Sequence, residues 1–188
     1  MVRWEPNARG RLQQAAFELF TERGFEQVTV AEIAERAGLT ERTFFRYFAD
    51  KREVFFSGSE VLRELMLSGV ASAPPGTPPI EAIAAALDAA GTMFDGHVAS
   101  ARRRSAIIAA HAELRERELI KLAGLAAALA GVLRARGVSD PAAALTAEAG
   151  IAVFKVAFER WTAEPDGPEL TQLMRAALGE LKAVAAGR

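Results

Sequence analysis

The most informative stretch of the sequence is residues 29–51, TVAEIAERAGLTERTFFRYFADK. Thr29 followed by Glu32 has the spacing of a capping box, in which a hydroxyl and a carboxylate satisfy free backbone amides at a helix start. Gly38 ends this helix early, because glycine readily takes the left-handed conformation that stops a helix, and Thr40 can cap a second short helix. Two short helices joined by a glycine turn predict a helix-turn-helix, whose second helix can enter the DNA major groove.

The charge around this stretch favours a nucleic-acid partner. Five basic and two acidic residues give residues 36–52 a net charge of +3, whereas the whole chain carries −1. The rest of the chain is therefore acidic, and the positive charge is concentrated near the short helices. A basic patch beside a capped helix suits binding to a phosphate backbone. The alternative is an ordinary α-hairpin with a glycine turn.

The whole sequence predicts an all-α fold, because apolar residues recur at helical spacing and no strand pattern is found. The predicted helices cover residues 7–23, 30–37, 41–48, 50–68, 78–94, 100–114, 115–136, 140–163 and 168–185. Residues 71–79 hold four of the eight prolines and predict a boundary loop. We therefore expect a three-helix helix-turn-helix domain over residues 1–52 with a connecting helix to about residue 70. A second helical domain should follow over residues 71–188.

Composition excludes several classes of site. The chain has no cysteine, and its two histidines, His97 and His111, lack the spacing of a zinc helix, so neither a metal site nor a cofactor is expected. No catalytic motif supports an enzyme. No apolar run approaches the length of a membrane span, so we expect a cytoplasmic protein without a membrane partner. The run Arg102-Arg103-Arg104 is interpreted as a solvated face.

The run from Thr29 to Phe48, followed by Asp50 and Lys51, resembles the signature of TetR-type transcriptional regulators. The pattern before it, with Leu12, two alanines, Leu-Phe and a final Gly-Phe pair, is similar to the first helix of that family. The resemblance covers about the first 55 residues. It implies a DNA-binding domain followed by a helical domain that binds a small molecule and forms a homodimer, with repression as the usual outcome.

The resemblance also implies which residues touch DNA. Arg42 would face guanine and Glu41 a cytosine amino group, while Thr29 would place its hydroxyl against a phosphate. The full set implied is Thr29, Thr40, Glu41, Arg42, Thr43, Arg46, Tyr47 and Lys51. As alternatives, the two capping threonines serve only as caps and Arg46 is a solvated charge, and Phe44 and Phe48 are interpreted as core. Phe45 stands where the family usually has Tyr, which removes one phosphate hydrogen bond.

Two further sets follow from the resemblance, each with packing inside one subunit as the alternative. A cavity for a mostly apolar effector would be lined by Met93, Phe94, His97, Ile107, His111, Phe154, Phe158 and Trp161. A dimer interface from the last two helices would use Leu145, Ile151, Ala152, Leu170, Leu173, Met174, Ala177 and Leu181. Gly150 and Gly179 predict close helix approach there, because glycine is a poor helix former.

The sequence therefore predicts a ligand-responsive repressor that binds a palindromic operator as a dimer and is released by a small, mostly apolar effector. The alternative is a DNA-binding regulator without a small-molecule ligand, controlled by a protein partner. An enzyme is the remote alternative.

Overall fold

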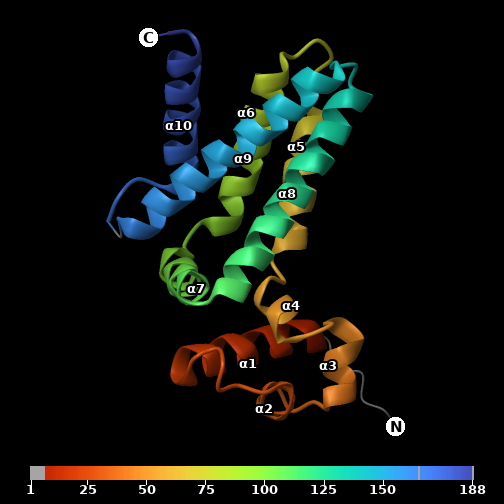
Figure 1. Cartoon of the computed structure of the whole chain (residues 1–188), viewed down its shortest axis with the longest axis vertical. Helices are drawn as coiled ribbons and strands as arrows, with labels where there is room; N and C mark the ends of the chain where they lie inside the picture. The colour runs from red at the N-terminus through yellow and green to blue at the C-terminus, as the bar shows by residue number, and fades with distance from the viewer. Residues whose placement is uncertain (1–6, 165, 188) are drawn as a thin grey trace. The chain divides into compact units, whose positions relative to one another are not determined.

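The computed structural model describes residues 7–164 and 166–187, which form ten α-helices, one 3-10 helix and no strand. The all-α prediction is confirmed. In chain order the elements are α1 (Ala8–Arg23), α2 (Val30–Arg36), α3 (Glu41–Tyr47), α4 (Lys51–Phe55), α5 (Ser59–Ser72), α6 (Pro79–Gly91), η1 (Thr92–Phe94), α7 (Val98–Ala110), α8 (Ala112–Ala135), α9 (Asp140–Ala163) and α10 (Leu170–Ala185) (Figure 1).

The chain divides into two compact units. The N-terminal unit contains residues up to Gly58 together with Ile107–Arg117, and the C-terminal unit contains Ser59–Ala106 and the residues from Glu118 onward. The sequence predicted a first domain from consecutive residues only. The structure adds to it the end of α7 and the start of α8, so the chain leaves this unit after α4 and returns to it once.

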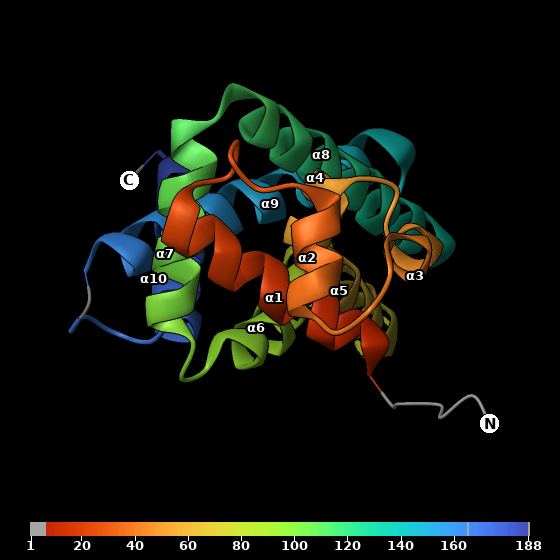
Figure 2. The ribbon, with the colours of Figure 1, turned by 90° about the horizontal axis from the view of Figure 1, so that it is seen from below.

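The N-terminal unit is built around aromatic side chains. The rings of Phe20 and Phe25 lie 5.1 Å apart, and Phe55 packs 5.6 Å from Phe20. Ile108 and Leu114 from the returning segment are buried in the same cluster. Helices α1 to α4 contribute residues to this core, and Figure 2 shows their ribbons from below.

The C-terminal unit is a helical bundle in which α5 packs along α6, and α6 packs against α9 and α10. Gly150 of α9 faces Ile83 of α6, and a Cβ at this glycine would lie 2.7 Å from the Ile83 Cγ2. The expected close helix approach is therefore confirmed at Gly150. At Gly179, no atom beyond its chain neighbours and the adjacent backbone of its own helix lies within 4 Å of where a Cβ would be, within the described residues.

Two helix boundaries differ from the sequence prediction. The single helix predicted over residues 50–68 is two helices, α4 and α5, separated by Phe56–Gly58. The buried side chains of Val54, Phe55 and Phe56 tie α4 to the N-terminal core. The break between α7 and α8 falls at His111, earlier than predicted.

One helix, α9, is long and apolar enough to cross a membrane by length and composition. The sequence prediction that no run approaches this length overlooked the alanine-rich helix. Its buried side chains, which include Val153, Phe154 and Trp161, pack within the C-terminal unit. Packing within the unit therefore accounts for the apolar side chains on the buried side of α9, whereas Leu145 and Val156 are exposed.

The contact between α5 and α6 makes a stability prediction. A Cβ at Gly69 would lie 2.6 Å from the Cα of Ala86, a backbone atom that cannot move without shifting α6. Gly69→Ala should therefore cost about 1–3 kcal/mol in the free energy of unfolding. Gly124→Ala on α8 is the matched control, because in the described chain no atom beyond the adjacent backbone of its own helix lies within 4 Å of its Cβ position. It should gain about 0.5–1 kcal/mol through helix propensity. Urea unfolding of both variants checks this, and equal effects would contradict the close approach.

Candidate nucleic-acid interface

The turn between α2 and α3 is set by local chemistry. Thr29 accepts from the Glu32 backbone N–H, and the Glu32 carboxylate accepts from the Thr29 N–H at 2.8 Å, so the predicted capping box is confirmed. Gly38 has a φ of 65°, the left-handed conformation that the turn requires. The Arg11 guanidinium donates to the carbonyl of Ala37, which ties the end of α2 to α1.

Helix α3 is held by its buried aromatic side chains. Phe44 is fully buried and Phe48, the C-cap, is 4% exposed, and both belong to the N-terminal core. Their predicted core role is confirmed. The Thr40 hydroxyl caps the start of the helix by accepting from the Thr43 N–H. The helix is therefore fixed at its start by a cap and along one side by two rings.

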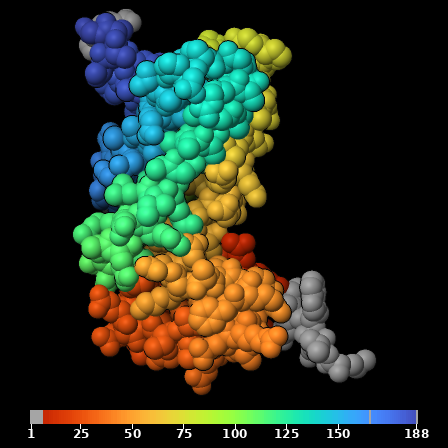
Figure 3. All heavy atoms as spheres, turned by 45° about the vertical axis from the view of Figure 1, so that its right-hand side comes forward, coloured from red at the N-terminus to blue at the C-terminus, as the bar shows by residue number. Residues whose placement is uncertain are grey.

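The opposite side of α3 is exposed. Glu41, Arg42 and Arg46 point outward, and within the described chain neither Glu41 nor Arg42 takes part in an ion pair. The Arg46 guanidinium lies over the Tyr47 ring at 4.9 Å from its centroid and donates to the Tyr47 hydroxyl at 3.3 Å. In the space-filling view of Figure 3, the orange atoms of the segment that includes α3 and α4 form much of the visible surface of this unit.

Phe45 belongs to this exposed side and was not among the predicted site residues. Its side chain is 55% exposed, although it is a large aromatic group, and its ring packs edge-on against Phe44 at 5.5 Å. The signal in the sequence is its place directly after a buried residue, which turns it by about 100° around the helix. An exposed aromatic ring beside two arginines can contact thymine methyl groups or sugars.

Part of the predicted basic patch is neutralised inside the unit. Arg36 pairs with Glu22 at 2.9 Å and with Glu18 at 3.5 Å, and its hydrogen bond to Glu22 lowers the pKa of that carboxyl. Arg52 pairs with Asp50 at 2.7 Å. The charge of +3 over residues 36–52 therefore overstates the charge offered to a ligand, which rests mainly on Arg42 and Arg46.

Lys51 occupies an internal position. Its ammonium group donates to the carbonyls of Phe25 at 2.9 Å, Val28 at 3.2 Å and Glu26 at 3.4 Å, and lies 4.3 Å from the centre of the Phe25 ring. Three carbonyls match the three hydrogens that an ammonium group can donate. In this conformation Lys51 joins the start of α4 to the loop between α1 and α2. Its contact with a DNA phosphate stays a prediction.

The predicted effector residues fall into two groups. Phe94, Phe154, Phe158 and Trp161 form one aromatic cluster in the C-terminal unit, with ring centroids 5.4–6.1 Å apart. Met93 is half-buried and precedes the first of these rings, whereas His97 is exposed. Ile107 and His111 lie in the N-terminal unit. The His111 ring packs 5.4 Å from Phe25, and its Nδ1 lies 3.6 Å from Glu26. The eight predicted residues are therefore divided between the two compact units.

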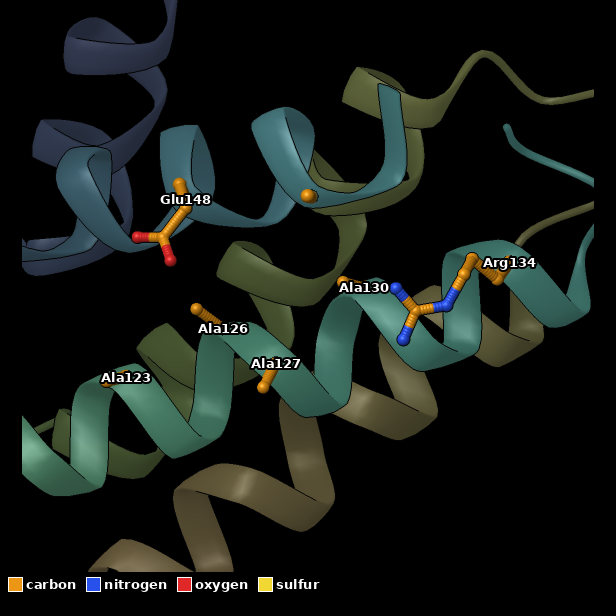
Figure 4. A pocket seen from close by; sticks show the side chains of 7 residues that line it. Ala123, Ala126, Ala127, Ala130, Arg134 and Glu148 are labelled. Atoms are coloured by element: carbon orange, nitrogen blue, oxygen red, sulfur yellow. The ribbon is translucent and has the colours of Figure 1, made fainter. Parts of the chain in front are cut away.

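A surface hollow of about 290 Å³ lies elsewhere, between α8 and α9 (Figure 4). Small side chains line it, with one arginine and one glutamate at its edges: Ala123, Ala126, Ala127, Ala130, Ala144, Arg134 and Glu148. None of the predicted effector residues lines it. Within residues 7–164 and 166–187, no three His, Asp or Glu side chains are grouped as a metal site would need.

Comparison with known proteins connects this geometry to a family. Residues 12–57 match the model of bacterial regulatory proteins of the TetR family, and residues 77–186 match the MftR C-terminal domain. The chain belongs to the TetR family. Its first match thus covers the helix-turn-helix, and its second covers most of the C-terminal unit.

Three proteins illustrate the relationship. The regulator TcmR of Streptomyces glaucescens is 37% identical over 91 residues, which are 48% of this chain and 40% of TcmR. The chain thus aligns with less than half of the length of this curated relative. A TetR-family regulator of Syntrophomonas wolfei shares the fold with a TM-score of 0.68 at 15% identity, covering 96% of this chain and 95% of that one. The Thermus thermophilus repressor FadR, solved with lauroyl-CoA, has a TM-score of 0.55 at 24% identity, covering 90% and 91%.

The predicted dimer residues of this TetR-family chain lie at different depths. Leu170, Leu173, Met174 and Ile151 are buried within their own unit, whereas Leu145 is 72% exposed and Ala152 is exposed. Ala177 and Leu181 are partly buried against the same core. Only part of the predicted set is therefore available to a second copy of the chain.

The Lys51 geometry predicts a loss of stability on substitution. Lys51→Met should cost about 1–3 kcal/mol in unfolding free energy, because carbonyls of the α1–α2 loop lose a charged donor. Arg42→Met, which removes an exposed charge without an ion-pair partner, should stay within about 0.5 kcal/mol. Thermal unfolding followed by circular dichroism measures both. Unchanged stability of Lys51→Met together with weakened DNA binding would assign Lys51 to the phosphate contact instead.

The capping box predicts a pH dependence. The backbone N–H of Thr29, then Arg23, then the Thr29 hydroxyl lower the pKa of Glu32 from 4.5 to about 2 in the folded chain. A lowered folded pKa adds stability above the unfolded value, and this stability is lost as the pH falls from about 4.5 through about 2. We therefore expect urea unfolding between pH 7 and pH 2 to give the wild type a higher free energy of unfolding than Glu32→Gln near neutrality. The two free energies should converge in acid. Glu35→Gln removes one exposed carboxylate from the same helix as the comparison. A constant gap between wild type and Glu32→Gln would exclude the linkage.

Proposed function

We propose that this TetR-family regulator is a ligand-responsive repressor that binds a palindromic operator in the cytoplasm as a homodimer. The observation that carries the proposal is the exposed side of α3. On that side Arg42, Arg46, Phe45 and Tyr47 are exposed, while the buried Phe44 holds the helix against the core. Arginine is suited to bidentate contact with guanine, so this side can read bases while the threonine caps meet phosphates.

The dimer follows from the size of the reading helix. A seven-residue helix reaches few base pairs, so useful specificity needs two copies on successive major grooves. The last two helices expose large apolar side chains that a second copy would cover, namely Leu145 and Val156 on α9 and Val184 on α10. We therefore assign the interface to the outward sides of α9 and α10, with Leu145 and Ala152 as the predicted residues best placed for it.

The effector is proposed to be apolar over most of its length. Phe94 and Phe158 leave part of their ring surface accessible, and Phe154 and Trp161 complete the cluster. The structural relative FadR of Thermus thermophilus is a repressor that was solved with lauroyl-CoA. A long-chain acyl compound would suit this aromatic cluster, and we adopt lauroyl-CoA as the first probe.

The segment that returns to the N-terminal unit offers a route for regulation. Helix α7 belongs to the C-terminal unit up to Ala106 and to the N-terminal unit from Ile107. In the N-terminal unit Leu114 is fully buried, and Arg117 donates to Glu53 of α4 at 2.7 Å. A ligand that favours one position of α7 would therefore bias the unit that carries α3 by linkage.

Selection of bound sequences from a random duplex pool tests the DNA-binding function. Wild type should enrich a pseudo-palindrome whose half-sites lie about 10 base pairs apart. Arg42→Ala should lose about 1–3 kcal/mol at that operator and relax preference at one position per half-site. Lauroyl-CoA should release wild type from the operator. If Arg42→Ala loses the same binding free energy on random DNA, Arg42 does not read bases. If no sequence is enriched and the wild type does not bind DNA at physiological salt, the repressor proposal is overturned.

A further inference from the structure

The Arg102 side chain on α7 is partly buried rather than solvated, so the interpretation of the Arg102-Arg103-Arg104 run as a solvated face is wrong at this position. Its Nε donates to the carbonyl oxygen of Thr162 at 2.6 Å. Its Nη2 is also buried, and no atom of the described chain accepts a hydrogen bond from it. Arg104 contrasts with it, because that guanidinium pairs with Glu118 at 3.3 Å.

A buried guanidinium donor without an acceptor is unfavourable. Arginine keeps its charge under all ordinary conditions, so it cannot relieve the cost by losing a proton. The Thr162 carbonyl lies in the last turn of α9, where the helix dipole favours a cation, and this explains why the side chain points there. This contact fixes the guanidinium and leaves Nη2 as an oriented donor without an acceptor in the described chain. Such a donor suits an oxygen acceptor on a ligand.

The residue that accepts from Arg102 follows directly on an aromatic cluster in the chain. Thr162 directly follows Trp161, whose ring lies 5.9 Å from Phe94 and 5.7 Å from Phe158. Ala101, the neighbour of Arg102 on α7, is buried in the same core cluster as Trp161. One oriented donor at the border of an apolar cluster is the usual composition of a site for an amphiphilic small molecule.

We propose that Arg102 is the polar anchor of the effector: its guanidinium binds an oxygen acceptor at the polar end of a hydrocarbon chain that packs on Phe94, Phe158 and Trp161. This assignment rests on the proposed effector-dependent function and narrows the effector to an acyl compound. Both a free carboxylate and the carbonyl of an acyl thioester offer such an oxygen, and the experiment separates them.

The test uses the full chain and three ligands of equal chain length: dodecanoate, lauroyl-CoA and dodecanol, titrated by calorimetry. Wild type should bind at least one of the acyl ligands about ten- to a hundredfold more tightly than dodecanol, as expected for a charged hydrogen bond. Arg102→Met replaces the guanidinium with an apolar, unbranched side chain and should therefore abolish this preference. Arg103→Met, at the exposed neighbouring position, is the matched control and should retain it. Loss confined to dodecanoate assigns the free acid, and loss confined to lauroyl-CoA assigns the thioester.

The remaining outcomes separate the two proposals. If all three ligands bind within threefold of one another and Arg102→Met leaves this unchanged, the anchor is overturned while an apolar effector stands. A lower melting temperature of Arg102→Met with full retention of the preference would show that Arg102 only caps α9, and would also overturn the anchor. If wild type binds none of the ligands and none releases it from its operator, the effector function itself fails.

Discussion

The N-terminal unit depends on the insertion of Phe44 and Phe48 into its core. Isolated helices shorter than about 12 residues are marginal in water, so the seven residues of α3 do not form a stable helix by themselves. The two buried rings provide the tertiary packing, and the Thr40 cap satisfies an amide that would otherwise be free. A helix held in this way can leave its other side entirely to a ligand, because no exposed side chain is needed for its stability.

Some basic side chains of this unit bind groups within the unit, and others are exposed to a ligand. Arg36 and Arg52 are paired with carboxylates, and Lys51 binds carbonyls of the α1–α2 loop. Arg42 and Arg46 remain on the outward side with Phe45 and Tyr47. The proposed interface is thus better described as a mixed aromatic and cationic surface than as a basic patch, which shifts the expected balance from phosphate attraction toward contact with bases and sugars.

The features that the sequence predicted well are those determined by neighbours in the chain. The Thr29–Glu32 capping box, the Gly38 turn and the burial of Phe44 all depend on spacings of a few residues. The features that it missed depend on contacts between distant residues. Lys51 meets carbonyls more than 20 positions away, and Arg102 meets one 60 positions away. Charge patterning gives no information about such partners, because a carbonyl acceptor is present at every residue.

The same limit explains the division of the predicted effector set. Helical spacing places Ile107 and His111 on apolar positions, but it cannot say which core they enter, and the structure assigns both to the N-terminal unit. Helix α7 contributes to both units, because its residues up to Ala106 belong to the C-terminal unit and those from Ile107 to the N-terminal unit. A role of Ile107 and His111 in effector binding therefore stays a prediction, and helical spacing alone could not tell which of the two units they would enter.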